Sequence, residues 1–328
     1  MDKKRLVEID SLRGIAMIAM ILVHTCYYFI ANPIAFTIWN YSELSVPVFI
    51  FCSVFLFFKK GKLYNFKNIW QYYTKRFWRL LFPFYVFLIF YIPSVYFFSN
   101  PKVDIIPYTI QSIFVTGGVD ISWLVALFLE LTILLPILLY LFEKQKVLFW
   151  VYSAISLIAS IIFLTPNLVA HWRIIMWLPY SLIPIWTILF LKWNDSKYFY
   201  LINILGFGIP AILIQDYQIL NHRTLSFFEN KYPPNLYYLS FGFVALTLLY
   251  FAASKGVFKY AQNVLDYFSR YSYSLFFIHY FVLYYFVLNI NKFHFVWYTF
   301  FGGVISVTVV IQLLFRYFSG LRKRHSLV

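Results

Sequence analysis

The sequence Arg5-Leu-Val-Glu-Ile-Asp-Ser-Leu-Arg-Gly-Ile-Ala-Met-Ile-Ala-Met-Ile-Leu-Val-His24 decides the fold class, because it opens a hydrophobic segment of membrane-spanning length. The segment extends from about Leu12 to Ala31. Arg13 stands in its first turn and His24 lies past its midpoint. The two positions are eleven apart, close to three helical turns, so both side chains lie near one stripe, about 16 Å apart along the axis. Polar side chains within a membrane are unfavourable, so we expect a cavity or a partner on that face.

The composition of the whole chain is that of an integral membrane protein. Of its 328 residues, 62% are hydrophobic and 24% aromatic, and only 12% are charged, about half the share of a soluble domain. The net charge of +15 does not indicate a nucleic-acid partner, because the basic residues form short clusters between apolar segments. Cys26 and Cys52 lie in apolar segments and predict neither a disulfide nor a metal site, and no metal-ligand spacing is found elsewhere.

Ten apolar segments predict an all-α, polytopic membrane helix bundle that forms a single domain over residues 1–328. The first segment is interpreted as a retained span, because it is too long and too polar for a cleaved signal peptide. The predicted spans are residues 12–31, 43–58, 80–98, 122–142, 147–164, 174–191, 198–214, 235–253, 272–288 and 296–318.

The distribution of lysine and arginine predicts the orientation of the bundle. With these ten spans, 22 of the 27 basic residues lie on the side that carries both chain termini. Cytoplasmic loops of multi-span proteins carry such an excess of Lys and Arg. Both termini are therefore expected in the cytoplasm, and the chain is expected to be a multi-pass protein of the cytoplasmic (plasma) membrane.

Residues 65–79 interleave aromatic and basic side chains. This pattern favours a helix that lies at the headgroup layer before the chain turns into the membrane at Leu80.

Arg76 and Arg79, with Lys75 beside them, carry two alternative interpretations. The first is an anchor to anionic lipid, which is common for such clusters. The second is a clamp for phosphate or pyrophosphate, since the guanidinium fork binds such oxygens with two hydrogen bonds. In the second case Trp78 and Tyr73 could stack on a purine.

The polar residues of the first span also allow two interpretations. Asp10 or Ser11 could cap the helix while Arg13 extends its side chain to the membrane surface. Alternatively Arg13 has a functional partner, for which Asp10 is the nearest candidate, because a cation in the first turn faces the unfavourable end of the helix dipole. His24 is either a hydrogen-bonded core residue or a general base, since imidazole exchanges its proton near neutral pH.

Four further residues are candidates for acceptor binding or for supporting the site. His279 is a second intramembrane imidazole, expected nearer to the outer half than His24. Glu130 is a mid-span carboxyl that must be protonated, paired or facing water. Glu43 begins the second span from the outside, and a solvated cap is its expected role. Trp123 opens the span that holds Glu130.

Together these residues resemble the acyltransferase-3 family of multispan membrane acyltransferases, whose ten-helix layout also fits. The matching segments are Ile9-Asp-Ser-Leu-Arg-Gly-Ile-Ala16, Val46-Pro-Val-Phe-Ile-Phe-Cys-Ser53, Arg76-Phe-Trp-Arg79 before Leu80-Leu-Phe-Pro83, Trp123-Leu-Val-Ala-Leu127 and Ser272-Tyr-Ser-Leu-Phe-Phe-Ile-His279.

The resemblance implies transfer of an acyl group, usually acetyl from acetyl-CoA, to a hydroxyl of a cell-surface glycan or a lipid-linked sugar. Arg76, Arg79 and Lys75 would then hold the nucleotide end of acetyl-CoA, or another acyl-CoA, on the cytoplasmic side. The acceptor would enter from outside. The expected partners are thus the lipid bilayer, the acyl-CoA and the saccharide, with neither nucleic acid nor metal.

Under the same resemblance His24 would act as general base on the acceptor hydroxyl, or as a transient acyl carrier. Arg13, with Asp10, would set the local field and guide the donor.

Two other functions compete with this one. A proton-coupled secondary transporter or flippase of a glycan precursor would use His24 and Glu130 as a proton relay. Matching Gly/Pro-broken helices in two halves, typical of many transporters, are not found in the sequence. A catalytically idle scaffold in a glycan-assembly complex would leave the polar stripe of the first span unexplained.

Overall fold

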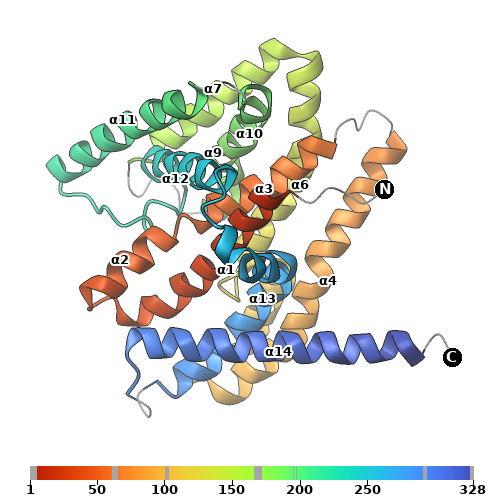
Figure 1. Cartoon of the computed structure of the whole chain (residues 1–328). Helices are drawn as coiled ribbons and strands as arrows, with labels where there is room; N and C mark the ends of the chain where they lie inside the picture. The colour runs from red at the N-terminus through yellow and green to blue at the C-terminus, as the bar shows by residue number, and fades with distance from the viewer. Residues whose placement is uncertain are drawn as a thin grey trace.

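The structure, a computed structural model, describes residues 6–60, 66–99, 103–165, 172–194, 196, 198–290 and 294–325. These ranges contain α-helices, two short 3-10 helices and no strand (Figure 1). The elements are α1 Val7–Cys26, η1 Tyr27–Phe29, α2 Pro33–Ser42, α3 Ser45–Lys60, α4 Phe66–Phe98, α5 Ile105–Ile113, α6 Ser122–Lys144, α7 Lys146–Ile162, α8 Trp172–Ile175, α9 Trp177–Tyr180, α10 Leu182–Trp193, α11 Phe199–Leu220, α12 Leu236–Ser254, η2 Lys259–Ala261, α13 Gln262–Leu288 and α14 Trp297–His325.

The prediction of an all-α membrane bundle is confirmed. Within the described residues, nine helical stretches are long and apolar enough to cross a bilayer. The segment predicted at residues 147–164 is α7, an apolar helix of 17 residues, at the lower limit for a spanning helix.

The predicted boundary at Leu80 is wrong because charge interrupts the hydropathy pattern without ending the helix. The chain does not turn at Leu80, since α4 runs without a break from Phe66 to Phe98 and includes Pro83 and Pro93. Proline inside a membrane helix is tolerated because neighbouring groups satisfy the freed backbone. The basic residues of α4 therefore stand on the same helix as its apolar half.

The segment between the first and second spans also contains a helix of its own. Asn32 directly precedes α2 and caps it. Its side chain accepts hydrogen bonds from the amides of Ile34 and Ala35 at 3.0 and 3.1 Å. Pro33 occupies the first helical position, where its missing N–H is not needed.

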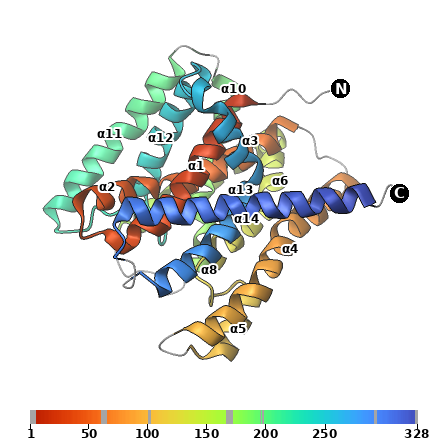
Figure 2. The same ribbon diagram turned by 60° about the horizontal axis from the view of Figure 1, so that its bottom comes forward.

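Helix α1 lies in the centre of the bundle and packs most extensively against α13 (Figure 1). Gly14 makes this possible, because a Cβ at that position would lie 2.4 Å from the carbonyl oxygen of Leu265. The polar face of α1 is thereby set against α13, and the long α14 lies across both helices (Figure 2).

Candidate active site

The centre of the site is a pair of imidazoles on α1 and α13. His24 Nδ1 and His279 Nε2 are 2.9 Å apart, and the ring centroids are 5.1 Å apart. His279 is completely buried, whereas His24 is partly exposed. The two residues are 255 positions apart in the chain, and the sequence pattern had placed His279 nearer to the outer half than its partner.

The hydrogen bonds of the pair determine which ring nitrogen is available for chemistry. His279 Nδ1 lies 3.0 Å from the carbonyl oxygen of Leu275. Because a carbonyl only accepts, His279 Nδ1 carries the proton and its Nε2 is an acceptor. His24 Nδ1 must then donate to it, which leaves the lone pair on His24 Nε2. In this arrangement Nε2 of His24 is the ring nitrogen that can accept a proton.

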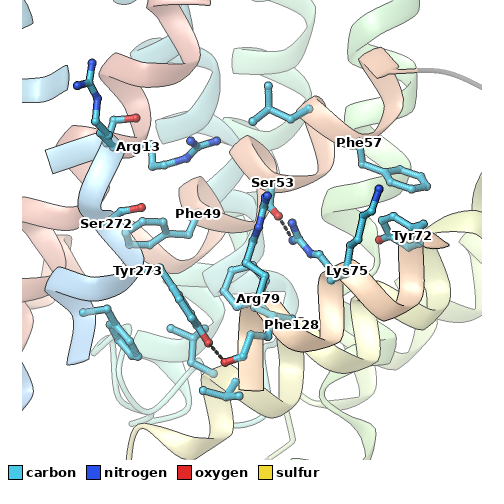
Figure 3. Close-up of a pocket in the computed structure, with 18 residues that line it drawn as sticks. Arg13, Phe49, Ser53, Phe57, Tyr72, Lys75, Arg79, Phe128, Ser272 and Tyr273 are labelled. Atoms are coloured by element: carbon cyan, nitrogen blue, oxygen red, sulfur yellow. Dashed lines mark hydrogen bonds between the residues drawn. The ribbon is translucent and has the colours of Figure 1, made fainter. Parts of the chain in front are cut away.

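A second feature is a cationic pocket at the end of the bundle where α1 begins, which we call the basic end. Its volume is about 550 Å³. Among the residues that the structure describes, no acidic side chain lines it (Figure 3). Its cationic lining residues are Arg13, Lys75, Arg76, Arg79 and Arg270. An excess of fixed positive charge of this kind attracts an anionic ligand.

Arg76, like Arg13, is half-buried, whereas the other three cations are exposed. It donates to the hydroxyl of Ser53 on α3, and its Nε is buried with no hydrogen-bond partner among the described residues. It also lies within electrostatic range of Arg13 and Arg79. Burying like charges together is unfavourable unless an anion joins them, so this arrangement fits a ligand with several negative oxygens.

The aromatic residues of the pocket differ from those predicted. Trp78, which is 67% exposed, and Tyr73 do not line it. Tyr72 and Tyr273 do so instead. Tyr273 donates to the carbonyl oxygen of Leu80 at 2.5 Å and so ties α13 to α4 beside the arginines.

Helical spacing gives no signal for Tyr273 and Arg270. They precede His279 on α13 by six and nine residues, which puts them about 120° and 180° around an ideal helix from that histidine, so their place in the pocket does not follow from its position.

The inner end of the pocket is apolar and approaches the imidazole pair. Phe276, which lines it, has its ring centroid 5.8 Å from that of His279. His24 itself does not line the pocket, so the expectation that Arg13 and His24 share one hollow is not met. One aromatic ring stands between the cationic pocket and the two imidazoles.

Asp10 lies at the basic end with Arg13. Its carboxylate accepts a hydrogen bond from Ser269 of α13 at 2.7 Å. Ser269 also lines the pocket, so Asp10 supports the wall of the pocket from behind.

The prediction that Glu43 is a solvated cap is wrong. Glu43 is 1% exposed and forms an ion pair with Lys231, which is 3% exposed. The Lys231 ammonium also lies over the rings of Tyr232 and Trp123, 4.6 and 5.3 Å from their centroids. The loop before α12 thus folds back and brings Glu43 and Trp123 together, because a buried carboxylate requires a cation.

Glu130 stands apart from these groups. It lies in α6, does not line the pocket, and its Oε2 is buried with no hydrogen-bond partner among the residues that the structure describes. A possible metal role is not supported either, since the described residues hold no cluster of three His, Cys, Asp or Glu side chains suited to a metal ion.

The fold and the site together define a multi-pass helical membrane protein with an imidazole pair next to a cationic pocket. Residues 6–316, nearly the whole chain, match the family model described as an acyltransferase domain. The chain therefore belongs to the acyltransferase-3 family and is a membrane acyltransferase, which confirms the resemblance of its motifs. Neither the curated proteins nor the solved structures contain a significant match.

Proposed function

We propose that this protein transfers an acyl group, in the first instance acetyl, from acyl-CoA to a hydroxyl of a cell-surface glycan or a lipid-linked sugar. The single observation that carries the proposal is the juxtaposition of a cationic pocket, whose described lining contains no acidic side chain, and an imidazole pair, with Phe276 at the boundary. The pocket suits the phosphates of CoA, and its apolar inner end suits the pantetheine arm and the acyl group.

In the proposed reaction His24 Nε2 removes the proton from the acceptor hydroxyl. The oxygen then attacks the thioester carbonyl, an ester C–O bond forms, and the C–S bond breaks. The sulfur leaves as the thiol of CoA after it takes up the proton from His24. His279 holds His24 in the required tautomer through the Nδ1–Nε2 hydrogen bond.

The arginines act on the donor and not on the proton. Arg76 and Arg79 contact the phosphates of CoA in this proposal, and Arg13 completes the field around them. Lys75, which is exposed at the pocket edge, adds a further cation.

The test uses the purified full-length chain. Replacement His24→Ala is expected to reduce acetyl transfer at least 100-fold while the thermal shift induced by CoA is retained. Arg76→Ala and Arg79→Ala are expected to weaken CoA binding. Lys255→Ala is the matched control, since Lys255 is exposed and lies outside the pocket.

Normal transfer by the His24→Ala protein would refute the proposed mechanism. Proton-coupled uptake of a glycan precursor into vesicles that contain no acyl-CoA would favour a transporter instead.

A further inference from the structure

A group of tyrosines stands beside the imidazole pair, on the side away from the basic end. The ring of Tyr280 meets the ring of His24 edge-on, with 5.6 Å between centroids. The ring of Tyr280 lies 5.6 Å from that of Tyr91, which in turn lies 5.4 Å from that of Tyr284. Tyr91 is on α4, about 18 Å along the axis from Arg79. Tyr91 is therefore remote from the arginines of the cationic pocket, whereas Tyr280 is adjacent to His24.

The hydroxyl groups of this region interact with one another and reach the protein surface. The Tyr91 hydroxyl interacts with the hydroxyls of Tyr280 and Tyr108. Burial raises the pKa of Tyr108 to about 12, and the negative charge of Asp120 acts in the same direction. Asp120 is exposed in the loop before α6 and also lies within electrostatic range of Tyr280. We call Tyr91, Tyr108, Tyr280 and Asp120 the tyrosine cluster.

The chemistry of the tyrosine cluster is the opposite of that of the cationic pocket. Its phenol groups both donate and accept hydrogen bonds, and the Asp120 carboxylate accepts only. A phosphate or carboxylate ligand would be repelled by Asp120, and an aliphatic alcohol would offer a single hydroxyl to a region that presents several hydrogen-bonding groups. An uncharged ligand rich in hydroxyls satisfies both groups, and its C–H faces can pack on the tyrosine rings.

We propose that the tyrosine cluster is the acceptor subsite, and that it binds an uncharged sugar with one hydroxyl directed at Nε2 of His24. This inference rests on the proposed function, because only an acyl transfer needs an acceptor hydroxyl at that nitrogen. The bound hydroxyl loses its proton to Nε2, and its oxygen forms the ester as the thioester C–S bond breaks. Access is from the end of the bundle opposite the basic end, where Asp120 is exposed.

The experiment compares three variants of nearly unchanged side-chain size. Tyr108→Phe and Tyr280→Phe each remove a hydroxyl group, and Asp120→Asn removes the negative charge. Tyr85→Phe is the matched control, since Tyr85 is also on α4 but donates to the carbonyl oxygen of Ile113 at 3.3 Å, outside the cluster. The probes are labelled acetyl-CoA and the envelope carbohydrate extracted from source cells that lack the gene. KM for the carbohydrate and kcat are measured, together with the thermal shift induced by CoA.

Each cluster variant is expected to raise the KM for the carbohydrate at least fivefold, with an unchanged CoA-induced shift, and the control is expected to match the unmodified protein. An unchanged KM in all three cluster variants overturns the inference and leaves the proposed function intact. Loss of the CoA-induced shift in these variants also overturns it, because their role would then be structural. If the unmodified protein transfers no label, the proposed function itself fails, and the acceptor subsite with it.

Discussion

His279 is bound on both ring nitrogens, to the Leu275 carbonyl and to His24, so it has no free atom with which to touch a substrate. It accepts a hydrogen bond from Nδ1–H of His24 and so keeps the lone pair of that residue on Nε2. Under the proposed function it is a positioning residue for the base.

Replacement His279→Leu is therefore expected to lower kcat about 100-fold, the lower range of general-base contributions, with little change in KM for acyl-CoA. His279→Gln retains a side-chain acceptor and should recover part of the lost rate. Steady-state kinetics on both variants checks this. Equal losses in the two would show that the side chain acts by packing and not by accepting the hydrogen bond.

A second prediction at the residue scale concerns the contribution of the Glu43–Lys231 ion pair to stability. Lys231→Met leaves a buried carboxylate without a cation and is expected to cost about 3–5 kcal/mol of unfolding free energy. The double variant Glu43→Gln, Lys231→Met removes both charges and should regain most of that loss. Thermal unfolding in detergent compares the three proteins, and a double variant as unstable as the single one would contradict the pairing.

These residues also show which features of the site could be predicted from the sequence and which could not. Spacing within one helix identified Arg13, His24, Arg76 and Arg79, because helical periodicity is local. The partners of His24 and Glu43 stand 255 and 188 residues away, and no local pattern encodes such contacts. Glu43 looked like a solvated cap because its cation comes from a loop before α12.

At the scale of the helix, the close contact of α1 and α13 depends on Gly14. Adding a methyl group there forces the helices apart, because the new Cβ would lie 2.4 Å from the Leu265 carbonyl oxygen. Gly14→Ala is expected to lower both the unfolding temperature and kcat, since the imidazole pair bridges the same two helices.

Gly206→Ala in α11 is the matched control, because a Cβ there meets nothing within 4 Å. Alanine loses less backbone conformational entropy on folding than glycine does. The Gly206→Ala substitution should therefore be neutral or stabilise the protein by up to about 1 kcal/mol. Circular-dichroism melting curves give the comparison. A Gly14→Ala protein as stable as the control would mean that the helices separate without penalty.

Helix existence was predictable from hydropathy, whereas helix length was not. The charged side chains of residues 65–79 lower the hydropathy there, so the pattern does not show that α4 is one continuous helix. Its backbone hydrogen bonds nevertheless continue through this charged part. The same effect concealed the first turns of α13, where Ser269 and Arg270 line the pocket.

At the scale of the whole molecule, the excess of basic residues predicts an orientation. An even number of crossings puts both termini on one side, and nine candidate spans together with α7 make such a number among the described residues. We expect both termini in the cytoplasm, with the pocket of Arg76 and Arg79 opening to the same side.

Reporter fusions at the C-terminus check this orientation. A fluorescent protein that folds only in the cytoplasm should be bright, and a phosphatase that is active only outside the cytoplasm should be inactive. The reverse result would place the donor pocket on the wrong side for cellular acyl-CoA.

The described lining of the cationic pocket, which contains no acidic side chain, has a consequence for turnover under the proposed function. The phosphates are common to acyl-CoA and to the spent CoA, so we expect the pocket to hold the product about as firmly as the substrate. Free CoA is expected to inhibit competitively against acyl-CoA, with an inhibition constant close to the KM of the donor, and initial-rate measurements at several CoA concentrations test it. An enzyme built in this way would respond to the acylated fraction of the cellular CoA pool and not to its total.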